Sequence, residues 1–353
     1  MKIEFFVGEF SEGGAERVIS ILANELINRG HEVAVLKYFN SINYYKTDER
    51  VKIYSLEEKT GTRAKLKNIL YLHKHLKDFD GVFVSFLAPF NILALIANAG
   101  NKTPLIVADR NDPARLPGNK YLRMLRDYLY RFADRVVVQT MKNKAYFSKG
   151  VQDKTEVIYN PLILSGKEGK ALNTKKTKTI INIGRLEPQK NQDMLIDVFS
   201  KFHQRHLEYS LVIYGEGSYR KELEKRIDEL NLTNCVSLPG NVKDIFDRLC
   251  ECEFFVLSSN YEGMPNALIE AMGLGVPVIS TRVSGATDLI EDGVNGLLID
   301  VGDSKALLTS MEKLAQDEKL RASLPLKASK VVDLLNSDRI CDRWEKIIKD
   351  VLR

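Results

Sequence analysis

Two glutamates separated by seven residues stand in a stretch that is otherwise small and apolar. Glu262 and Glu270 belong to "SSNYEGMPNALIEAM" (258–272), in which Gly263, Met264 and Pro265 directly follow the first of them. Proline suits the first position of a helix, because the N–H group that it lacks has no partner to lose there. The sequence therefore predicts Glu262 in a loop and Glu270 about one and a half turns inside the following helix.

Carboxylates in such surroundings predict a ligand that carries hydroxyl groups. The residues around Glu270 are apolar, and a buried glutamate is rare unless it is paired or bound to a ligand. A salt-bridged glutamate on the surface is the competing interpretation. Two carboxylates that accept hydrogen bonds from hydroxyls indicate recognition of a sugar and of a ribose.

Two cations follow another expected strand. Arg185 and Lys190 lie in "GRLEPQKNQDML" (184–195), directly after the apolar run "TIINIG" (179–184). An arginine can bind a diphosphate through two N–H groups, and a lysine adds a point charge. The alternative is a loop that carries two solvated charges.

A pair of glycines precedes the first expected helix. Gly13 and Gly14 lie in "GEFSEGGAERV" (8–18), where a missing side chain lets a ligand approach the backbone and the helix N–H groups favour an anion. The pattern is not G-x-G-x-x-G, so it does not predict a nicotinamide site. Taken alone, it also fits a tight turn.

Short apolar runs alternate with helical patterns along the chain, which predicts parallel sheets covered on both faces. The expected strands are 2–7, 31–39, 81–86, 103–109 and 135–140, and then 179–184, 209–215, 235–240, 253–258, 276–281 and 296–300. We predict an α/β protein with two Rossmann-like doubly wound domains, 1–163 and 164–335, facing across a cleft. Residues 165–178 are expected to form an exposed linker or long loop. A final helix, 336–353, is expected to pack back towards the first domain.

Composition excludes several classes of protein. The 353 residues have a net charge of +5 and 28% charged side chains, a normal balance for a soluble protein. Cys250 and Cys252 are one residue apart and the four cysteines form no paired framework, which predicts a reducing cytoplasm and no zinc site. The first residues are typical of a strand rather than a secretory signal, and the uncharged run 82–99 is too short to span a membrane. Asp78 and Asp80 form a D-x-D that precedes a strand, at the wrong end for the cleft, so no metal is expected.

Five blocks of the sequence resemble retaining glycosyltransferases of family 4, which have the two-domain fold called GT-B. They are "GGAERV" (13–18), "NIGRLEPQKNQDMLI" (182–196), "LVIYGEGSYRKELE" (211–224), "LPGNVKDIFD" (238–247) and "EGMPNALIEAMGLGVPVISTRVSGATDLIEDGVNGLLI" (262–299). The blocks extend over nearly the whole chain. The last, with its E-x7-E spacing and trailing "GVPVI" and "NGLL", is the most specific.

The resemblance implies roles for these residues. Glu262 would bind hydroxyls of the transferred sugar, and Glu270 would bind the ribose of the nucleotide. Arg185 and Lys190 would neutralise the diphosphate, which makes them, with Glu262, the expected catalytic residues. The other implied donor contacts are Gly13, Gly14, Gly215, Val242 (near the base), Gly263, Met264 and Asn266.

The implied function is metal-independent, retaining transfer of a hexose or N-acetylhexosamine from a nucleotide sugar, expected to be UDP-linked. The implied acceptor is a glycan, expected to be carried on polyprenyl diphosphate and extended through an α-linkage during assembly of a surface polysaccharide. No cofactor and no nucleic acid partner are expected, and the expected location is the cytoplasm, peripheral at the inner face of the cell membrane. A nucleotide-sugar epimerase or phosphorylase of related fold and a non-catalytic sugar-nucleotide sensor are the alternatives.

The sequence departs from the family pattern at one place. Many members have a histidine after a strand of the first domain, where this chain has Arg110 and Asn111 in "VADRNDP" (107–113). Arg110 is expected to bind a hydroxyl of the transferred sugar or to help hold a phosphate. No side chain of this stretch is a convincing nucleophile, so we favour attack by the acceptor hydroxyl on the face that the diphosphate leaves.

The sequence of residues 119–135 predicts a basic helix that could bind the acceptor. Lys120, Arg123 and Arg126 recur at three-residue steps and so share a broad face. That face is predicted to bind a polyprenyl diphosphate at an anionic membrane surface. The alternative is an ordinary core helix with a solvated basic face. In that alternative the apolar side faces the core; it consists of Tyr121, Leu122, Leu125, Leu129 and Phe132.

Overall fold

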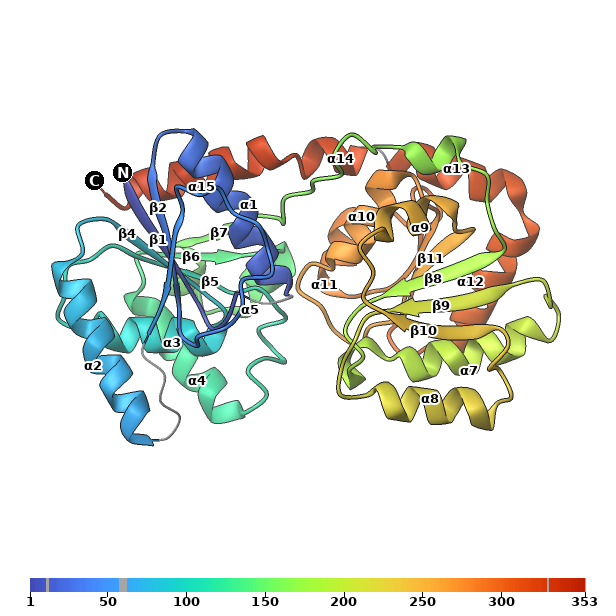
Figure 1. Cartoon of the computed structure of the whole chain (residues 1–353), viewed down its shortest axis with the longest axis horizontal. Coiled ribbons are helices and arrows are strands. Elements are labelled where there is room, and N and C mark those ends of the chain that lie inside the picture. The colour runs from blue at the N-terminus through green and yellow to red at the C-terminus, as the bar shows by residue number, and fades with distance from the viewer. Residues whose placement is uncertain (11–12, 57–61, 329, 353) are drawn as a thin grey trace. The chain divides into compact units, whose positions relative to one another are not determined.

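The chain divides into two compact units, each built around its own parallel sheet (Figure 1). The structure is a computed structural model and describes residues 1–10, 13–56, 62–328 and 330–352. Unit 1 consists of Met1–Pro161 and Asn336–Arg353, and unit 2 of Leu162–Leu335. The predicted boundary after residue 163 lies two residues beyond the one that the contacts give.

Unit 1 contains a seven-stranded sheet in which every neighbouring pair is parallel. The strand order is β3-β2-β1-β4-β5-β6-β7. The strands are β1 (Lys2–Val7), β2 (Glu32–Lys37), β3 (Lys52–Ser55), β4 (Val82–Phe86), β5 (Leu105–Ala108), β6 (Arg135–Val138) and β7 (Thr155–Val157). The order reverses between β1 and β4, which makes this the doubly wound arrangement that the alternating pattern predicts. Strands β3 and β7 were not predicted.

Helices cover both faces of this sheet (Figure 1). They are α1 (Gly14–Asn28), α2 (Thr62–Asp78), α3 (Ala88–Ala97), α4 (Lys120–Leu129), α5 (Met141–Tyr146), α6 (Lys149–Gln152) and the 3-10 turn η1 (Tyr130–Phe132). Successive residues of a strand point to opposite faces, so Phe5 packs in the core under α1 and Phe6 in the core under α3. Both are fully buried.

The last helix, α15 (Ser337–Asp350), packs in unit 1, beside α1. Its Trp344 is fully buried and stacks on Phe86 of β4, with the ring centroids 5.6 Å apart. Arg29, which caps α1, holds it by ion pairs of 2.5 Å to Asp342 and 3.0 Å to Glu345. This pairing joins residues that are more than 300 positions apart in the sequence.

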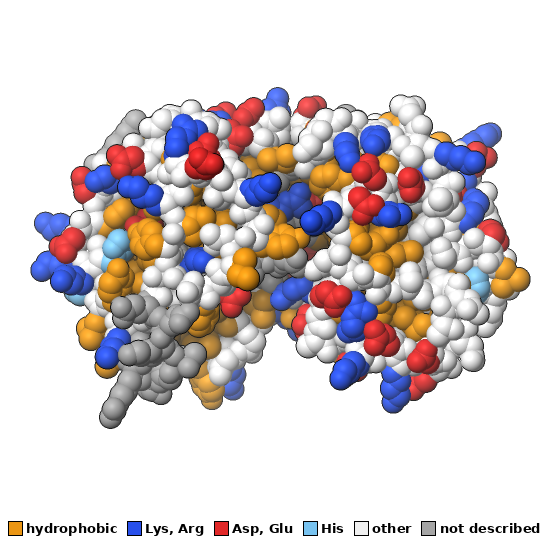
Figure 2. Space-filling view, viewed as in Figure 1, with side chains coloured by type: hydrophobic (Ala, Val, Ile, Leu, Met, Phe, Trp, Pro, Cys, Tyr) orange, Lys and Arg blue, Asp and Glu red, His pale blue; other side chains and the backbone are white. Residues whose placement is uncertain are grey.

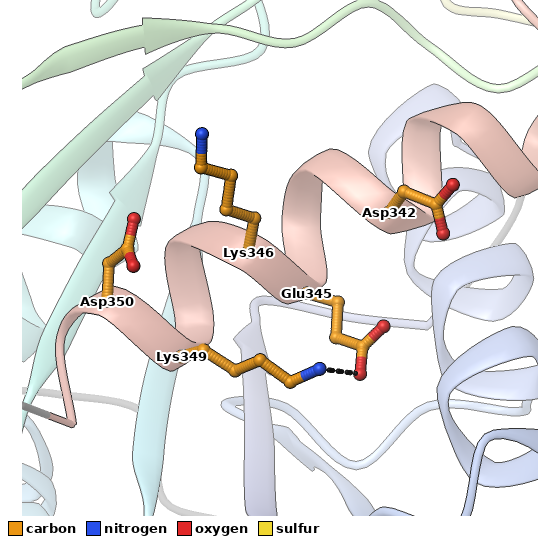
Figure 3. A pocket seen from close by; sticks show the side chains of 5 residues that line it. All are labelled: Asp342, Glu345, Lys346, Lys349 and Asp350. Atoms are coloured by element: carbon orange, nitrogen blue, oxygen red, sulfur yellow. Dashed lines mark ion pairs between the residues drawn. The ribbon is translucent and has the colours of Figure 1, made fainter.

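A shallow hollow lies beside the outer side of α15 (Figure 3). It is lined by Asp342, Glu345, Lys346, Lys349 and Asp350. Figure 3 shows the side chains pointing in different directions, with Lys349 paired to Glu345 at 2.6 Å. Because these charges do not converge on a common point, we assign no ligand to the hollow.

Unit 2 has a six-stranded parallel sheet of order β10-β9-β8-β11-β12-β13. Its strands are β8 (Thr179–Ile183), β9 (Ser210–Tyr214), β10 (Val236–Gly240), β11 (Phe254–Leu257), β12 (Val278–Thr281) and β13 (Leu297–Ile299). Its helices are α7 (Gln192–His203), α8 (Arg220–Glu229), α9 (Ile245–Glu251), α10 (Asn266–Leu274), α11 (Ser284–Leu289), α12 (Ser304–Gln316), α13 (Glu318–Ala328) and α14 (Lys330–Leu334), with 3-10 turns η2 (Lys170–Asn173) and η3 (Pro188–Lys190). The predicted strands of this half all correspond to observed ones.

Residues 165–178 are not a linker between the units. They form a loop of unit 2 that contains η2, with Ala171 fully buried. Lys167 and Lys170 both pair with Asp247, at 2.8 and 2.9 Å. Of the two predicted alternatives, a linker or a long loop, the structure therefore has the long loop, which ion pairs and one buried small side chain hold on the surface of unit 2.

Candidate functional site

Glu262 lies in the loop between β11 and α10, and its carboxylate is buried. Lys190 Nζ is 2.5 Å from its Oε1, and the Ser259 hydroxyl donates a hydrogen bond of 2.7 Å to the same oxygen. A buried carboxylate needs such partners to offset the loss of hydration. The sequence named Glu262 and Lys190 separately, and the structure brings them together as an ion pair.

Hydrogen bonds hold the loops after β8 and β11 together. The Ser258 hydroxyl donates to the carbonyl of Lys190 at 2.8 Å, and the Asn260 N–H donates to the carbonyl of Gln189 at 2.8 Å. The Gln189 amide donates to the carbonyl of Tyr261, also at 2.8 Å. Strands β8 and β11 are neighbours in the sheet, so these bonds fix the positions of Lys190 and Glu262 at its carboxyl edge. Sequence reasoning named none of the residues Ser258, Ser259 and Gln189 for this role.

Helix α10 begins beside Glu262 and carries Glu270. The helix starts at Asn266, with Pro265 as its N-cap, so the proline precedes the first helical position that the sequence predicted for it. Glu270 is buried in the second turn, and Met264 is buried in the loop before the helix. The first N–H groups of an α-helix lack intrahelical partners and carry partial positive charge. The positive end of the α10 dipole therefore follows directly after the loop that carries Glu262.

Gly285 in α11 fixes that loop, although sequence reasoning gave it no role. A Cβ atom at Gly285 would lie 2.7 Å from Met264 Cα and 2.8 Å from the carbonyl oxygen of Gly263. Contacts this short do not occur in folded proteins without a shift of one partner. The glycine in "VSGATDL" (283–289) was the only sequence signal for this packing.

The remaining predicted donor residues of unit 2 follow adjacent strands. Arg185 follows β8 and is exposed, and its guanidinium bonds none of the residues that the structure describes. Gly215 follows β9 with a φ of 135°, and a Cβ there would lie 2.1 Å from the carbonyl oxygen of Gly184. That glycine is therefore required by close packing of two loops. Val242 follows β10 and is half-buried.

These strands are neighbours in the order β10-β9-β8-β11. One edge of the unit 2 sheet thus collects a buried ion pair, an exposed arginine and the start of a helix. Ligands of parallel α/β sheets bind at this edge. An ammonium, a guanidinium and backbone N–H groups suit a diphosphate, whereas carboxylates suit hydroxyl groups.

The predicted donor residues of unit 1 lie at the start of α1. Gly13 is its N-cap and Gly14 its first residue. A Cβ on Gly13 would lie 1.9 Å from a carboxylate oxygen of Glu16. Residues 11 and 12 of the same turn lie outside the described part of the chain.

The predicted basic face of the acceptor helix is wrong. Arg126 is fully buried, and its guanidinium donates to the carbonyls of Pro113 and Leu116 at 2.8 and 2.5 Å. It also bonds Asp127 at 2.7 Å. Arg123 turns back to the carbonyls of Pro117 and Gly118, at 2.9 and 2.8 Å, so of the three cations Lys120 alone is fully exposed. The helix ends at Leu129 and not near residue 135, because Arg135 already begins β6.

The predicted apolar side of the same helix does not face the core. Tyr121 is 68% exposed, and Met124 and Tyr128, which the predicted side did not include, are 67% and 52% exposed. Leu122, Leu125 and Phe132 are exposed as well. The helix is therefore turned with respect to the prediction: Arg126 faces inward and the apolar stripe faces outward. The inward position suits an arginine because carbonyl groups and the Asp109 carboxylate are there to receive it.

Asp109 is the buried carboxylate behind Arg126. It accepts a hydrogen bond of 3.1 Å from the Tyr130 hydroxyl and lies 3.6 Å from Arg126 Nη1. Burial raises the pKa of Asp109 to about 6, against the opposing effect of Arg126. The polar partners of this carboxylate are therefore the Tyr130 hydroxyl and the Arg126 guanidinium. Asp109 directly follows β5.

Arg110 and Asn111 follow Asp109. Arg110 is 8% exposed and donates through Nη2 to Asn160 Oδ1. Asn111 is half-buried, and its carbonyl accepts a hydrogen bond of 3.1 Å from Asn143.

Neither a metal cluster nor a membrane span is found in the described ranges. No three His, Cys, Asp or Glu side chains of those ranges are grouped so that they could hold a metal ion. Asp78 and Asp80 are both exposed. None of the described helices combines the length and the apolar character needed to cross a bilayer.

Comparison with known proteins adds to this geometry. The model of "Glycosyltransferase Family 4" matches residues 12–165, and that of "Glycosyl transferases group 1" matches residues 167–331. A Campylobacter jejuni enzyme, the α-1,4-N-acetyl-D-galactosaminyltransferase that acts on GalNAc-α-(1→4)-GalNAc-α-(1→3)-diNAcBac-PP-undecaprenol, is 32% identical over 366 aligned residues, which cover 99% of each chain. The chain belongs to glycosyltransferase family 4. This confirms the resemblance and identifies the protein as a glycosyltransferase.

This family 4 enzyme is also similar to a second curated relative and to a solved structure. A second C. jejuni protein, the N-acetylgalactosamine-N,N'-diacetylbacillosaminyl-diphospho-undecaprenol 4-α-N-acetylgalactosaminyltransferase, is 29% identical over 93% of each chain. The crystal structure of Anabaena Alr3699/HepE in complex with UDP and glucose superposes with a TM-score of 0.82 at 20% identity, covering 99% of this chain and all of the other. The predicted GT-B fold of two Rossmann-like domains is confirmed.

Proposed function

We propose that this family 4 glycosyltransferase transfers a hexose or N-acetylhexosamine from a UDP-sugar to a glycan carried on polyprenyl diphosphate. The transfer retains the donor configuration and gives an α-linkage in surface polysaccharide assembly. The observation that carries the proposal is the ion pair between half-buried Lys190 and buried Glu262 at the carboxyl edge of the unit 2 sheet. Two C. jejuni relatives, named for action on undecaprenyl-diphosphate-linked glycans, support the acceptor, and UDP in the Anabaena structure supports the nucleotide.

In the proposed donor complex, Glu262 accepts hydrogen bonds from hydroxyls of the transferred sugar and Glu270 from the ribose. Arg185, Lys190 and the N–H groups around Gly263, Met264 and Asn266 hold the diphosphate. Gly215 and Val242 border the nucleotide, and Gly13 and Gly14 are further proposed donor contacts.

The reaction breaks the bond between the anomeric carbon and the diphosphate oxygen, which keeps the electron pair. The acceptor hydroxyl oxygen bonds to the anomeric carbon on the same face, and its proton passes to the diphosphate. Negative charge on the leaving group grows along this path. Fixed cations and amides therefore stabilise the transition state more than the ground state. In the proposed mechanism these groups replace a metal ion.

The outward face of α4 supports attachment to a membrane. Tyr121, Met124, Leu125 and Tyr128, the α4 apolar face, recur at steps of three and four residues and are all exposed. Figure 2 shows apolar side chains at the surface of unit 1 together with many cations. Residues 101–150 contain 11 Lys and Arg against 4 Asp and Glu. Apolar side chains flanked by cations favour an anionic lipid surface, and we propose peripheral attachment there, at the inner face of the cell membrane.

A panel of UDP- and GDP-sugars, mixed with a polyprenyl-diphosphate-linked glycan in the presence and absence of EDTA, tests the proposed function. We expect transfer from a UDP-sugar that EDTA does not reduce, and a product whose anomeric NMR coupling is that of an α-linkage. A β-linked product would contradict retention, and loss of turnover with EDTA would contradict the metal-free mechanism. Binding of UDP-sugars without transfer to any acceptor would favour a sensor.

A further inference from the structure

Arg110 is a buried cation whose hydrogen-bonding capacity is largely unused. Its side chain lies over the ring of Phe86, with Cζ 5.6 Å from the ring centroid, and its Nη2 bonds Asn160. Its Nε and Nη1 are buried and have no hydrogen-bond partner among the described residues. A guanidinium carries five N–H donors, and buried donors without acceptors destabilise a folded protein.

The neighbouring acceptors leave Nε and Nη1 of Arg110 without a hydrogen bond. Asp109 accepts a hydrogen bond from the Tyr130 hydroxyl and forms an ion pair with Arg126, as described above. The Asn160 side-chain oxygen is neutral and is shared with Gln139, whose amide donates to it at 2.7 Å. Burial lowers the pKa of Arg110 to about 9, so the guanidinium is still charged at neutral pH. Lys190 shows the contrast, because its carboxylate partner lies 2.5 Å away.

The surroundings of Arg110 are those of a binding site in a parallel sheet. Phe86 ends β4, whereas Arg110, Gln139 and Asn160 follow β5, β6 and β7. These four strands are consecutive neighbours in the sheet. Four side chains thus meet at the carboxyl edge, where ligands of such sheets bind. Gln139 Oε1 is also buried without a partner in the described chain, and it can accept a hydrogen bond from a hydroxyl.

We propose that Arg110, Gln139 and Asn160 form a subsite for an oxyanion of one of the enzyme's substrates. An oxyanion would supply acceptors to the unused N–H groups and neutralise the guanidinium, while Gln139 Oε1 would accept from an adjacent hydroxyl. A neutral hexose could occupy the donors but would leave the charge in place. The oxyanion is the carboxylate of a hexuronic sugar or the diphosphate of the lipid carrier. This inference rests on the proposed function, because it assumes sugar and diphosphate substrates.

The first arm of the test examines the donor. Calorimetry on the full chain compares UDP-glucuronate and UDP-galacturonate with UDP-glucose and UDP-galactose, for the wild type and for Arg110→Gln. If the carboxylate is the ligand, the wild type binds the uronates about ten-fold more tightly or better, as expected for a charge-assisted hydrogen bond. Arg110→Gln removes that preference. Arg115→Gln, at an exposed arginine of the same loop, preserves it.

The second arm examines the acceptor. Binding of a short-chain polyprenyl diphosphate is compared with that of the corresponding polyprenol, for the same three proteins. If the diphosphate is the ligand, Arg110→Gln weakens binding of the diphosphate by about ten-fold or more and leaves binding of the alcohol unchanged. Arg115→Gln changes neither.

The proposal is overturned if Arg110→Gln changes affinity less than about two-fold in both arms, well below the effect of a charged hydrogen bond. Its melting temperature and its affinity for UDP show whether the variant is folded. Should it not fold, Arg110→Lys keeps the charge in a smaller side chain and is compared in the same way. Both arms measure binding, so they decide the question even if no donor is ever transferred, an outcome that would count against the proposed function alone.

Discussion

The two units are both parallel sheets covered by helices, but they differ in net charge and in the number of exposed apolar side chains. Unit 1 contains 30 Lys and Arg against 22 Asp and Glu, whereas unit 2 contains 22 against 25. Of the 22 exposed large apolar side chains in the described residues, 16 belong to unit 1. Lys190, the half-buried cation of the unit 2 site, has a carboxylate partner, and the buried Arg110 of unit 1 has no ion pair to any described residue.

The difference indicates two kinds of binding surface. In unit 2, Lys190 and Glu262 are held in place by each other and by the loops around them before any ligand arrives, while Arg185 is exposed. Groups fixed in advance are the condition for strong electrostatic stabilisation of a transition state. Unit 1 has charges and apolar groups that no other part of the described chain satisfies. In the proposed function, unit 1 binds the acceptor and a lipid surface, and unit 2 binds the nucleotide sugar.

The largest expected effect comes from the unit 2 site. Glu262→Gln removes the carboxylate that we propose to bind the transferred sugar, and it should lower kcat/KM about 10²–10³-fold, the usual cost of removing one such group. Affinity for free UDP should change little, because UDP lacks that sugar. Steady-state transfer and calorimetry check this, with Glu291→Gln at an exposed loop position as the matched control. Equal losses in UDP affinity and in turnover would place Glu262 at the nucleotide instead.

Lys190→Met should have the next largest effect, in two measurements. It leaves Glu262 buried without its cation, which should lower the free energy of unfolding by about 1–3 kcal/mol. It also removes a cation from the proposed diphosphate site and should lower kcat about 100-fold. Chemical denaturation and transfer assays measure the two, and Lys201→Met, at an exposed position of α7, is the control. Unchanged stability would mean that the pair is not compensating a buried charge.

The apolar surface of unit 1 should show a smaller effect, on membrane binding alone. Replacing Tyr121, Met124 and Tyr128 together by serine should weaken binding to vesicles that contain phosphatidylglycerol by about ten-fold or more, because buried apolar area drives such binding. Flotation with and without the anionic lipid measures it. Leu207→Ser, which removes a side chain that is 75% exposed in unit 2, should have no effect. Equal binding of the triple variant would remove the α4 apolar face from the proposal.

The smallest expected effect tests how rigidly unit 2 holds its site. Gly285→Ala places a methyl group against Met264 and Gly263, which should shift the loop 263–265 and lower kcat/KM by about ten-fold, a loss typical of slightly misplaced groups. Gly150→Ala, where a Cβ meets nothing within 4 Å and φ is not positive, is the control. Full activity of both variants would mean that the loop 263–265 can shift without loss of activity, and that unit 2 does not hold its site rigidly.

Much of the unit 2 site could be predicted from the sequence because its residues lie in short segments next to strands. Glu262, Glu270, Arg185 and Lys190 each follow or flank an apolar run whose end is visible in the sequence. The ion pair between Lys190 and Glu262 was not predicted, since it joins positions 72 residues apart. Neither was the contact of Gly285 with Met264, which depends on how two loops pack.

The orientation of α4 shows why the acceptor region was harder to predict. The spacing of Lys120, Arg123 and Arg126 establishes that they lie on one side of a helix, but spacing does not say which side faces the protein. The usual rule places the apolar side inward. Here the Asp109 carboxylate and the carbonyls of a preceding loop receive Arg126, so the apolar side faces outward.

The sequence alone determined the alternation of strands and helices, the two sheets, and the motifs that assign the chain to its family, because these depend on local periodicity and on short segments. The tertiary structure decided which charges are compensated and which are not. It paired Lys190 with Glu262, buried Arg126 among carbonyls, and placed Arg110 among side chains from neighbouring strands without an ion pair to any described residue. Compensation depends on distance in space, and residues far apart in the chain meet only when the sheet brings the ends of its strands together.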